Sequence, residues 1–136
     1  MNAQAADPHR FRNLVDVHPR LVAAVRVIVA KLVSEGHYPI ITQGMRTTAY
    51  QQVLYAQGRT TPGKIVTNAD GILRKSKHQV QADGFAHAMD FAWIVDGKVT
   101  WDGPWERLGE LAREHGLKWG GDWKFPDRPH VELPDE

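Results

Sequence analysis

The sequence predicts a small α+β domain in which helices pack against a central, mainly antiparallel sheet. Three observations lead to this prediction. The chain has 136 residues, enough for one hydrophobic core and too few for two ordinary ones. Apolar residues recur at helical spacing in some segments and alternate with period two in others. The pair Asp96-Gly97 separates two strand-like segments, which indicates an antiparallel hairpin. We therefore expect one domain over residues 1–136, with residues 1–17 as an N-terminal arm or a short first turn.

The first predicted elements are a helix and a strand. Pro19 suits the first helical position, and Gly36 suits the end of the helix. His37–Gln43 reads as a strand, with Pro39 near its start or at a sheet edge. Between Pro19 and Gly36 the apolar residues at helical spacing, which predict a core helix, are Leu21, Val25, Ile28 and Leu32.

A second helix is expected to begin at Thr48 and to end near Gly58. Thr48 and Gln51 have the spacing of a capping box, in which the two side chains satisfy backbone N–H groups at a helix start. Arg46 then lies at a strand-to-helix junction, from which side chains commonly reach a cleft. Position alone is equally compatible with a surface arginine.

The segment from Gly58 to Lys75 is rich in glycine and polar residues and contains two turn signals. We expect a long loop with one short strand around Ile65 and Val66. A loop of this length in a small domain is usually functional or mobile.

The strongest strand signal begins after Ala86. Met89, Phe91 and Trp93 share one face, which we assign to the core, whereas Asp90 lies among small residues on the opposite face. That arrangement leaves space beside a single carboxylate.

The remaining elements are a helix and two short strands. Pro104 opens a helix that ends at Gly116 and whose apolar face is formed by Trp105, Leu108, Leu111 and Ala112. Leu117–Trp119 is the next candidate strand. The last strand, His130–Leu133, places His130 and Glu132 on one face.

Composition limits the class of protein. Apolar residues make up 42% of the chain and charged residues 24%, as in soluble globular domains. The formal net charge is +1 with both signs interspersed, which argues against a nucleic-acid partner. The chain has no cysteine, so a metal ion would be held by His, Asp or Glu. We see neither a secretory signal nor a bilayer-spanning segment, and therefore expect no stable membrane insertion.

Two imidazoles and one carboxylate suggest a metal site. His78, Asp90 and His130 would supply the three protein ligands of a catalytic zinc site, with water in the fourth position. On spacing alone, ordinary buried or surface histidines remain the alternative, because the chain contains seven.

Several motifs together resemble one family. S-K-H at 76–78, A-M-D-F at 88–91, G-G-D-W at 120–123, P-H-V-E-L at 129–133 and Q-G-M-R-T at 43–47 span about two-thirds of the chain. In this combination the sequence resembles the zinc peptidases that cleave bacterial cell-wall peptides. That family includes D-alanyl-D-alanine carboxypeptidases and the L-alanyl-D-glutamate endopeptidases of phage endolysins. The resemblance implies a hedgehog/DD-peptidase-like fold.

The resemblance also implies roles for individual residues. It makes His78, Asp90 and His130 the zinc ligands, and Asp127 the general base that takes a proton from the attacking water. It makes Arg46 the group that binds the substrate and stabilises the developing oxyanion.

Two further side chains are expected at the substrate. The resemblance places Ser76 close to the substrate and to the ligand histidine. Trp123 is a candidate for the substrate cleft, together with Trp119, although structural packing is the simpler role for both. Glu132 is a rival for the role of base because it shares a face with His130, and a structural carboxylate is its other interpretation.

One spacing departs from the family pattern. The aspartate usually follows the first histidine by seven residues, whereas Asp90 follows His78 by twelve. We predict a five-residue insertion, with a turn at Asp83-Gly84. His87 is the alternative first ligand, although strand alternation directs it away from the face of Asp90.

The leading functional hypothesis is a zinc-dependent endolysin that hydrolyses the L-alanyl-D-glutamate bond of peptidoglycan stem peptides, because the Phe91–Trp101 hairpin most resembles the phage branch. It would act as a monomer and stay in the host cytoplasm until lysis. The alternatives are a D-alanyl-D-alanine carboxypeptidase and a non-catalytic zinc-binding cell-wall module on the same fold.

Overall fold

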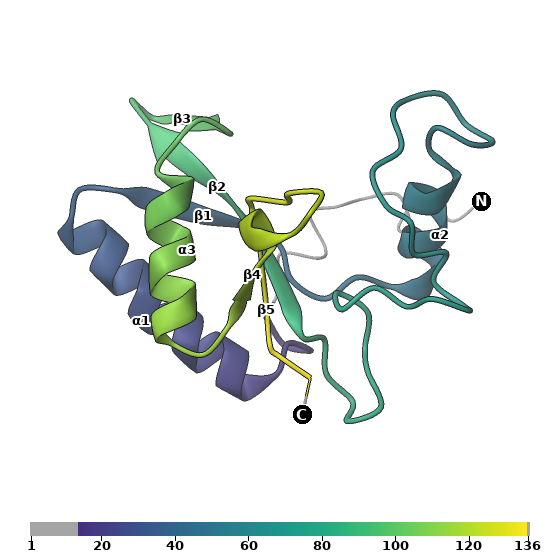
Figure 1. Ribbon diagram of the computed structural model, residues 1–136, viewed down its shortest axis with the longest axis horizontal. Helices are drawn as coiled ribbons and strands as arrows, with labels where there is room; N and C mark the ends of the chain where they lie inside the picture. Colours follow the sequence, from purple (N-terminus) through teal and green to yellow (C-terminus); the bar gives the residue numbers. More distant parts are fainter. Residues whose placement is uncertain (1–13, 136) are drawn as a thin grey trace.

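The structure, a computed structural model, describes residues 14–135 (Figure 1). Most of the predicted arm lies outside the described residues. Its last residues form the short turn given as the alternative, in which the Val17 N–H donates to the Leu14 carbonyl oxygen at 3.1 Å, and buried Val17 forms a parallel bridge with Ala86. The elements follow in the order α1 (Pro19–Ser34), β1 (Tyr38–Gln43), α2 (Thr48–Ala56), β2 (Ala88–Val95), β3 (Lys98–Thr100), α3 (Trp105–Glu114), β4 (Lys118–Trp119), a 3-10 helix (Gly120–Asp122) and β5 (His130–Glu132).

The five strands form one sheet in the order β1-β2-β5-β4, with β3 paired to β2, and every pairing is antiparallel. The predicted α+β fold with an antiparallel sheet is confirmed. Helices α1 and α3 lie together on one side, whereas α2 and the long loop after it lie on the other side of the molecule (Figure 1). No helix in the described part of the chain is long and apolar enough to cross a membrane.

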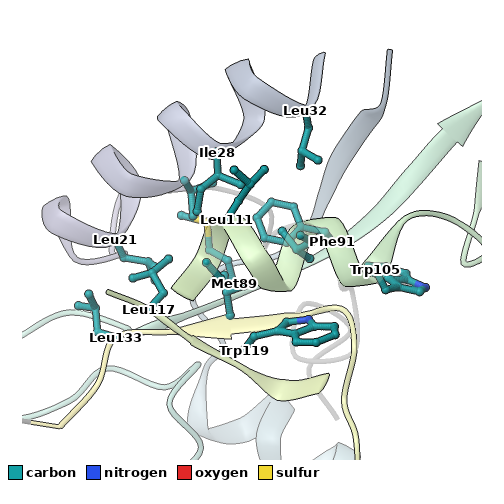
Figure 2. Packing of buried hydrophobic residues seen from close by; sticks show 14 of the residues in the cluster. Leu21, Ile28, Leu32, Met89, Phe91, Trp105, Leu111, Leu117, Trp119 and Leu133 are labelled. Atoms are coloured by element: carbon teal, nitrogen blue, oxygen red, sulfur yellow. The ribbon is translucent and has the colours of Figure 1, made fainter. Parts of the chain in front are cut away.

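The core lies between the sheet and helices α1 and α3. The predicted core face of β2 is confirmed, because Met89, Phe91 and Trp93 are fully buried. Figure 2 shows Met89 and Phe91 packed among side chains of both helices. The predicted helix faces are also confirmed. The buried residues of these faces are Leu21, Val25, Ile28 and Leu32 in α1, and Trp105, Leu108, Leu111 and Ala112 in α3.

The predicted hairpin is confirmed. Val95 pairs with Lys98, so Asp96 and Gly97 are the two loop residues. Their φ angles of 51° and 74° are those of a type I′ turn, which matches the twist of the flanking strands.

Two local predictions are wrong. Helix α2 is capped by Thr47, whose side chain accepts a hydrogen bond from the Tyr50 N–H, so Thr48 and Gln51 do not form a capping box. Ile65 and Val66 form no strand and are both more than half exposed. Their β-branched side chains favour a strand only where a neighbouring strand and a packed face are available.

Gly109 in α3 is a tightly packed position, because a Cβ there would lie 2.3 Å from the indole of Trp119. We expect Gly109→Ala to destabilise the fold by about 1–3 kcal/mol through overpacking. Helix propensity alone would favour alanine by about 1 kcal/mol, so the two effects have opposite signs. Urea denaturation measures the difference. Val27→Ala, at an exposed position of α1, is the control and should change stability by less than about 0.5 kcal/mol. A more stable Gly109→Ala protein would contradict the packing argument.

Candidate metal centre

His78, Asp90 and His130 come together although they lie far apart in the sequence. Asp90 of β2 pairs directly with His130 of β5. His78 reaches them from the loop before β2, and its backbone C=O accepts a hydrogen bond of 2.7 Å from the Arg46 N–H. One ligand atom from each of the three residues lies within 4.8 Å of the other two. The structure therefore brings together the three residues expected to be ligands.

The His78 ring presents a free nitrogen to this cluster. Its Nδ1 lies 2.8 Å from the carbonyl oxygen of Gly44, so Nδ1–H donates and Nε2 carries the lone pair. Within the described part of the chain, Nε2 is buried and makes no hydrogen bond, although it lies 3.2 Å from an Asp90 oxygen. Burial lowers the pKa of His78, which keeps the imidazole neutral despite the nearby Asp90. A buried, neutral, unpartnered nitrogen fits a metal ligand.

His130 is oriented by a second carboxylate. Its Nε2 lies 2.7 Å from Glu132 and donates to it, which leaves Nδ1 facing Asp90 at 3.1 Å. Burial alone would lower the pKa of His130, but hydrogen bonds to Asp90 and Glu132 raise it to about 10. A metal at Nδ1 would replace the proton there, while Glu132 would keep the ring in place.

Asp90 is ionised at the centre of this cluster. Burial alone would raise its pKa, but His78 and His130 hold the pKa well below its usual range. Arg46 adds positive charge, with Nη2 3.8 Å from an Asp90 oxygen. Burial lowers the pKa of Arg46, whereas the negative charge of Asp90 raises it. The guanidinium therefore remains charged. Two imidazoles and one ionised carboxylate fit a divalent metal ion with an open coordination position.

Asp127 lies at the open side of the cluster. Half of its side chain is exposed, and its carboxylate lies 3.9 Å from His130 Nδ1. Partial burial and the nearby charge of Asp90 raise the pKa of Asp127, which suits an acceptor of protons near neutral pH.

The Gly-Gly turn places Asp127. The Asp127 N–H donates to the Gly120 carbonyl oxygen at 2.8 Å, and a Cβ on Gly120 would lie 2.2 Å from the Asp127 carbonyl oxygen. Glycine is therefore required for this close approach.

His87 lies outside the cluster. Its Nε2 bonds Asp83 at 2.7 Å, and its ring lies against that of His18. The predicted turn is present, because the Gly84 N–H donates to Gln81 and Gly84 has a φ of 90°. His87 is thus engaged with Asp83 outside the cluster, and His78 takes the position beside the Asp90 carboxylate.

The other expected site residues line one cleft of about 1240 Å³, which His78, Asp90 and His130 also line. Ser76 Oγ accepts a hydrogen bond of 3.2 Å from the His78 N–H. Trp123 is partly exposed, and its ring centroid lies 5.0 Å from that of His130. Trp119 is buried in the core instead, where its indole N–H donates to the Arg128 carbonyl oxygen.

Two glutamines were missed by sequence reasoning. Gln43 Oε1 accepts from Nε and Nη2 of Arg46, and Gln51 Oε1 accepts from Nη1. Gln43 also pairs with Asp90 across the sheet, after a bulge in β1 that follows Ile41. Alternation could have placed Gln43 near Asp90 only if the strand pairing had been known.

Glu132 is placed as a support for His130, and its removal tests that placement. Glu132→Ala leaves the buried Nε2–H of His130 unpaired and the ring free to turn. We expect metal affinity to fall by about 10- to 100-fold, with a smaller change in kcat at saturating metal. A competition titration against a chromophoric chelator measures the affinity, and Glu106→Ala on the exposed surface of α3 is the control. Unchanged affinity with lost turnover would instead make Glu132 the base.

Comparisons with known proteins identify relatives. A family model described as D-alanyl-D-alanine carboxypeptidase matches residues 72–133, a span that contains the three clustered residues and Asp127. The peptidoglycan L-alanyl-D-glutamate endopeptidase CwlK of Bacillus subtilis (strain 168) is 36% identical over 130 residues, covering 87% of this chain and 74% of that protein. The crystal structure of the L-Ala D-Glu endopeptidase ChiX of Serratia marcescens superposes with a TM-score of 0.60 and 26% identity, covering 96% of this chain and 88% of that one.

Proposed function

We propose that this chain, which belongs to the metallopeptidase family of D-alanyl-D-alanine carboxypeptidases and peptidoglycan L-alanyl-D-glutamate endopeptidases, is a peptidoglycan endopeptidase. It would hydrolyse the L-alanyl-D-glutamate bond of stem peptides with a bound zinc ion. The observation that carries the proposal is the buried, unpartnered Nε2 of His78, which faces Asp90 and His130 on the wall of an open cleft. The choice of bond is supported by the two relatives, both of which are endopeptidases for this bond.

Zinc is the metal proposed because two imidazoles and one carboxylate form a familiar catalytic zinc set. His78 would bind through Nε2 and His130 through Nδ1, since their other nitrogens are engaged with Gly44 and Glu132. When bound, the ion would supply Lewis acidity and lower the pKa of the attacking water.

The chain's own residues would move the proton and stabilise charge. Asp127 is the half-exposed carboxylate at the cluster, so it would accept the proton of the water and deliver it to the leaving amine. Arg46 donates three hydrogen bonds to Gln43 and Gln51 and retains further N–H groups on Nη1 and Nη2. These groups would stabilise the developing oxyanion. Ser76 and Trp123 line the same cleft and would contact the substrate.

Digestion of purified peptidoglycan, with and without a chelator, tests the proposal. Mass analysis should find new D-glutamyl or D-isoglutaminyl N-termini that disappear with chelator and return with added zinc. Release of D-alanine alone would instead indicate a carboxypeptidase. Intact peptidoglycan after treatment with zinc-loaded protein would indicate a binding module, and cleavage that resists chelation would contradict a metal-dependent mechanism.

We also propose that the activity serves lysis and that the protein remains in the cytoplasm as a monomer until the membrane is breached. The support is the resemblance of the hairpin at Phe91–Trp101 to phage endolysins. Expression in a bacterial host should cause lysis only after the membrane is permeabilised, and Asp127→Asn should prevent it. Lysis without permeabilisation would contradict the cytoplasmic location, and a dimer in size-exclusion chromatography would contradict the monomer.

A further inference from the structure

Buried polar side chains surround Arg46 on the side of the cleft formed by α2 and the long loop. Gln51 is 0% exposed and Gln79 is 1% exposed, although glutamine is a residue type found mostly at the surface. A fully buried amide is retained only when its oxygen and its NH₂ group both find partners. The partners of Gln51 connect the candidate site to the loop.

Gln51 makes two different contacts at once. Its Oε1 accepts a hydrogen bond of 2.8 Å from Nη1 of Arg46. Its Nε2 donates to the Ala69 carbonyl oxygen at 2.9 Å and lies 3.3 Å from the Thr67 hydroxyl. The orientation of the amide is fixed chemically, because a guanidinium only donates and a backbone carbonyl only accepts.

Gln43 holds the Arg46 guanidinium together with Gln51. Its Oε1 accepts from Nε at 2.9 Å and also from Nη2, so the two glutamines hold the guanidinium along two of its edges. The planar guanidinium is thereby fixed in orientation. Without Gln51, the attraction of Asp90, whose Oδ2 is already 3.8 Å from Nη2, would favour rotation of Arg46 onto the ligand carboxylate. Such a pair would withdraw Arg46 from the substrate.

Gln79 holds the same loop without contacting Arg46. Its Nε2 donates to the Gly71 carbonyl oxygen and to Thr48, both at 3.1 Å. Its Oε1 accepts from the Ser76 N–H at 2.9 Å. Gln79 therefore provides a matched comparison, because its loss loosens the loop and leaves the hydrogen bonds of the guanidinium intact.

From these contacts we infer that Gln51 is a positioning residue for Arg46, and that it links the guanidinium to the loop wall at Thr67–Ala69. The inference rests on the proposed role of Arg46 in hydrolysis. It also gives Gln51 a role in place of the capping box that the sequence suggested. The Gln51 side chain contacts Arg46 and the loop at Ala69, and it does not cap the start of α2.

Three variants separate the two contacts of Gln51. Gln51→Met has a similar volume and loses both contacts. Gln51→Glu keeps an oxygen for Arg46 and loses the donor to Ala69. Gln79→Met loses only contacts to the loop and to α2. On a synthetic L-alanyl-D-glutamyl stem peptide, we expect Gln51→Met to lower kcat by about 10- to 100-fold, as for other residues that orient a reacting group. Gln51→Glu and Gln79→Met should mainly raise KM.

A double-mutant cycle with Arg46→Met supplies a readout that a purely structural role would not change. If Gln51 acts through Arg46, adding Gln51→Met to Arg46→Met should cause no further loss of kcat. Additive losses would overturn the inference. An inactive wild-type protein would count against the proposed function instead, and the next measurement tests the positioning without turnover.

Solvent exchange of the Arg46 Nη1–H that is donated to Gln51 reports this contact directly, because the Nε–H is held by Gln43 in every variant. Its NMR signal, identified by its absence in Arg46→Met, should exchange slowly in the wild type, Gln51→Glu and Gln79→Met proteins. It should exchange at least several-fold faster in Gln51→Met. Equal exchange in all four proteins would overturn the inference. If Gln51→Met fails to fold, Gln51→Leu at reduced temperature takes its place, and slow exchange there would likewise contradict positioning by Gln51.

Discussion

Replacing Asp127 by asparagine is expected to lower kcat by about 10²- to 10⁴-fold, the usual range for loss of a general base. Asparagine has nearly the same shape, but its amide does not accept a proton at neutral pH. The carboxylate is half exposed, so the substitution should leave the fold intact. Its partial burial and the charge of Asp90 raise the pKa of Asp127, which would suit the proposed role of base. Steady-state kinetics on the stem peptide, with metal content measured on the same samples, provides the test.

Asp122→Asn is the matched control for this experiment. Asp122 belongs to the same C-terminal segment and pairs with Arg113 on the surface, away from the cleft. Its replacement should leave kcat near the wild-type value. Near-normal turnover by Asp127→Asn would remove Asp127 from the role of base, and a collapse of turnover in Glu132→Ala at saturating metal would then assign the role to Glu132.

His78→Ala is expected to abolish zinc binding and to reduce turnover to that of chelated wild-type protein. The variant removes Nε2 of His78, the nitrogen of the His78, Asp90 and His130 cluster that is buried and makes no hydrogen bond within residues 14–135. His87→Ala is the matched control, because His87 lies three residues after the turn at Gln81–Gly84 and is bonded to Asp83 instead of Asp90. It should retain both zinc and turnover. The reverse result would make His87 the ligand.

Zinc should also stabilise the folded chain, which gives this prediction a readout without substrate. A ligand that binds only the native state stabilises it by about 2.7 kcal/mol at a concentration 100 times its Kd. Thermal unfolding should therefore show a zinc-dependent rise in Tm for the wild type and for His87→Ala. Little or no rise is expected for His78→Ala, because a site of two ligands remains. An equal rise in all three proteins would contradict the assignment of His78.

Several elements were predictable because their signals are local. The apolar residues that recur at helical spacing from Leu21 to Leu32 predict the buried face of α1, and Asp96-Gly97 predicts the hairpin turn. Both depend on backbone and side-chain preferences within a few residues. The strand expected at Ile65 fails because no described strand pairs with it, and the cap expected at Thr48 is provided by Thr47.

The core face of β2 and the position of Asp90 among small residues follow from the sequence, because alternation in a strand is a property of the local chain. Resemblance then indicated which residues would join it. How these residues meet depends on the packing of segments that are distant in the sequence. The pairing of Asp90 with both Gln43 and His130 aligns the carboxylate, the glutamine that holds Arg46 and a candidate ligand in one row across three strands. That row depends on the strand register between distant segments. The contacts of His78 with Gly44 and of Gln51 with Ala69 likewise join segments that are far apart in the sequence. Contacts between residues far apart in sequence are set by packing of the whole domain, which no local pattern encodes.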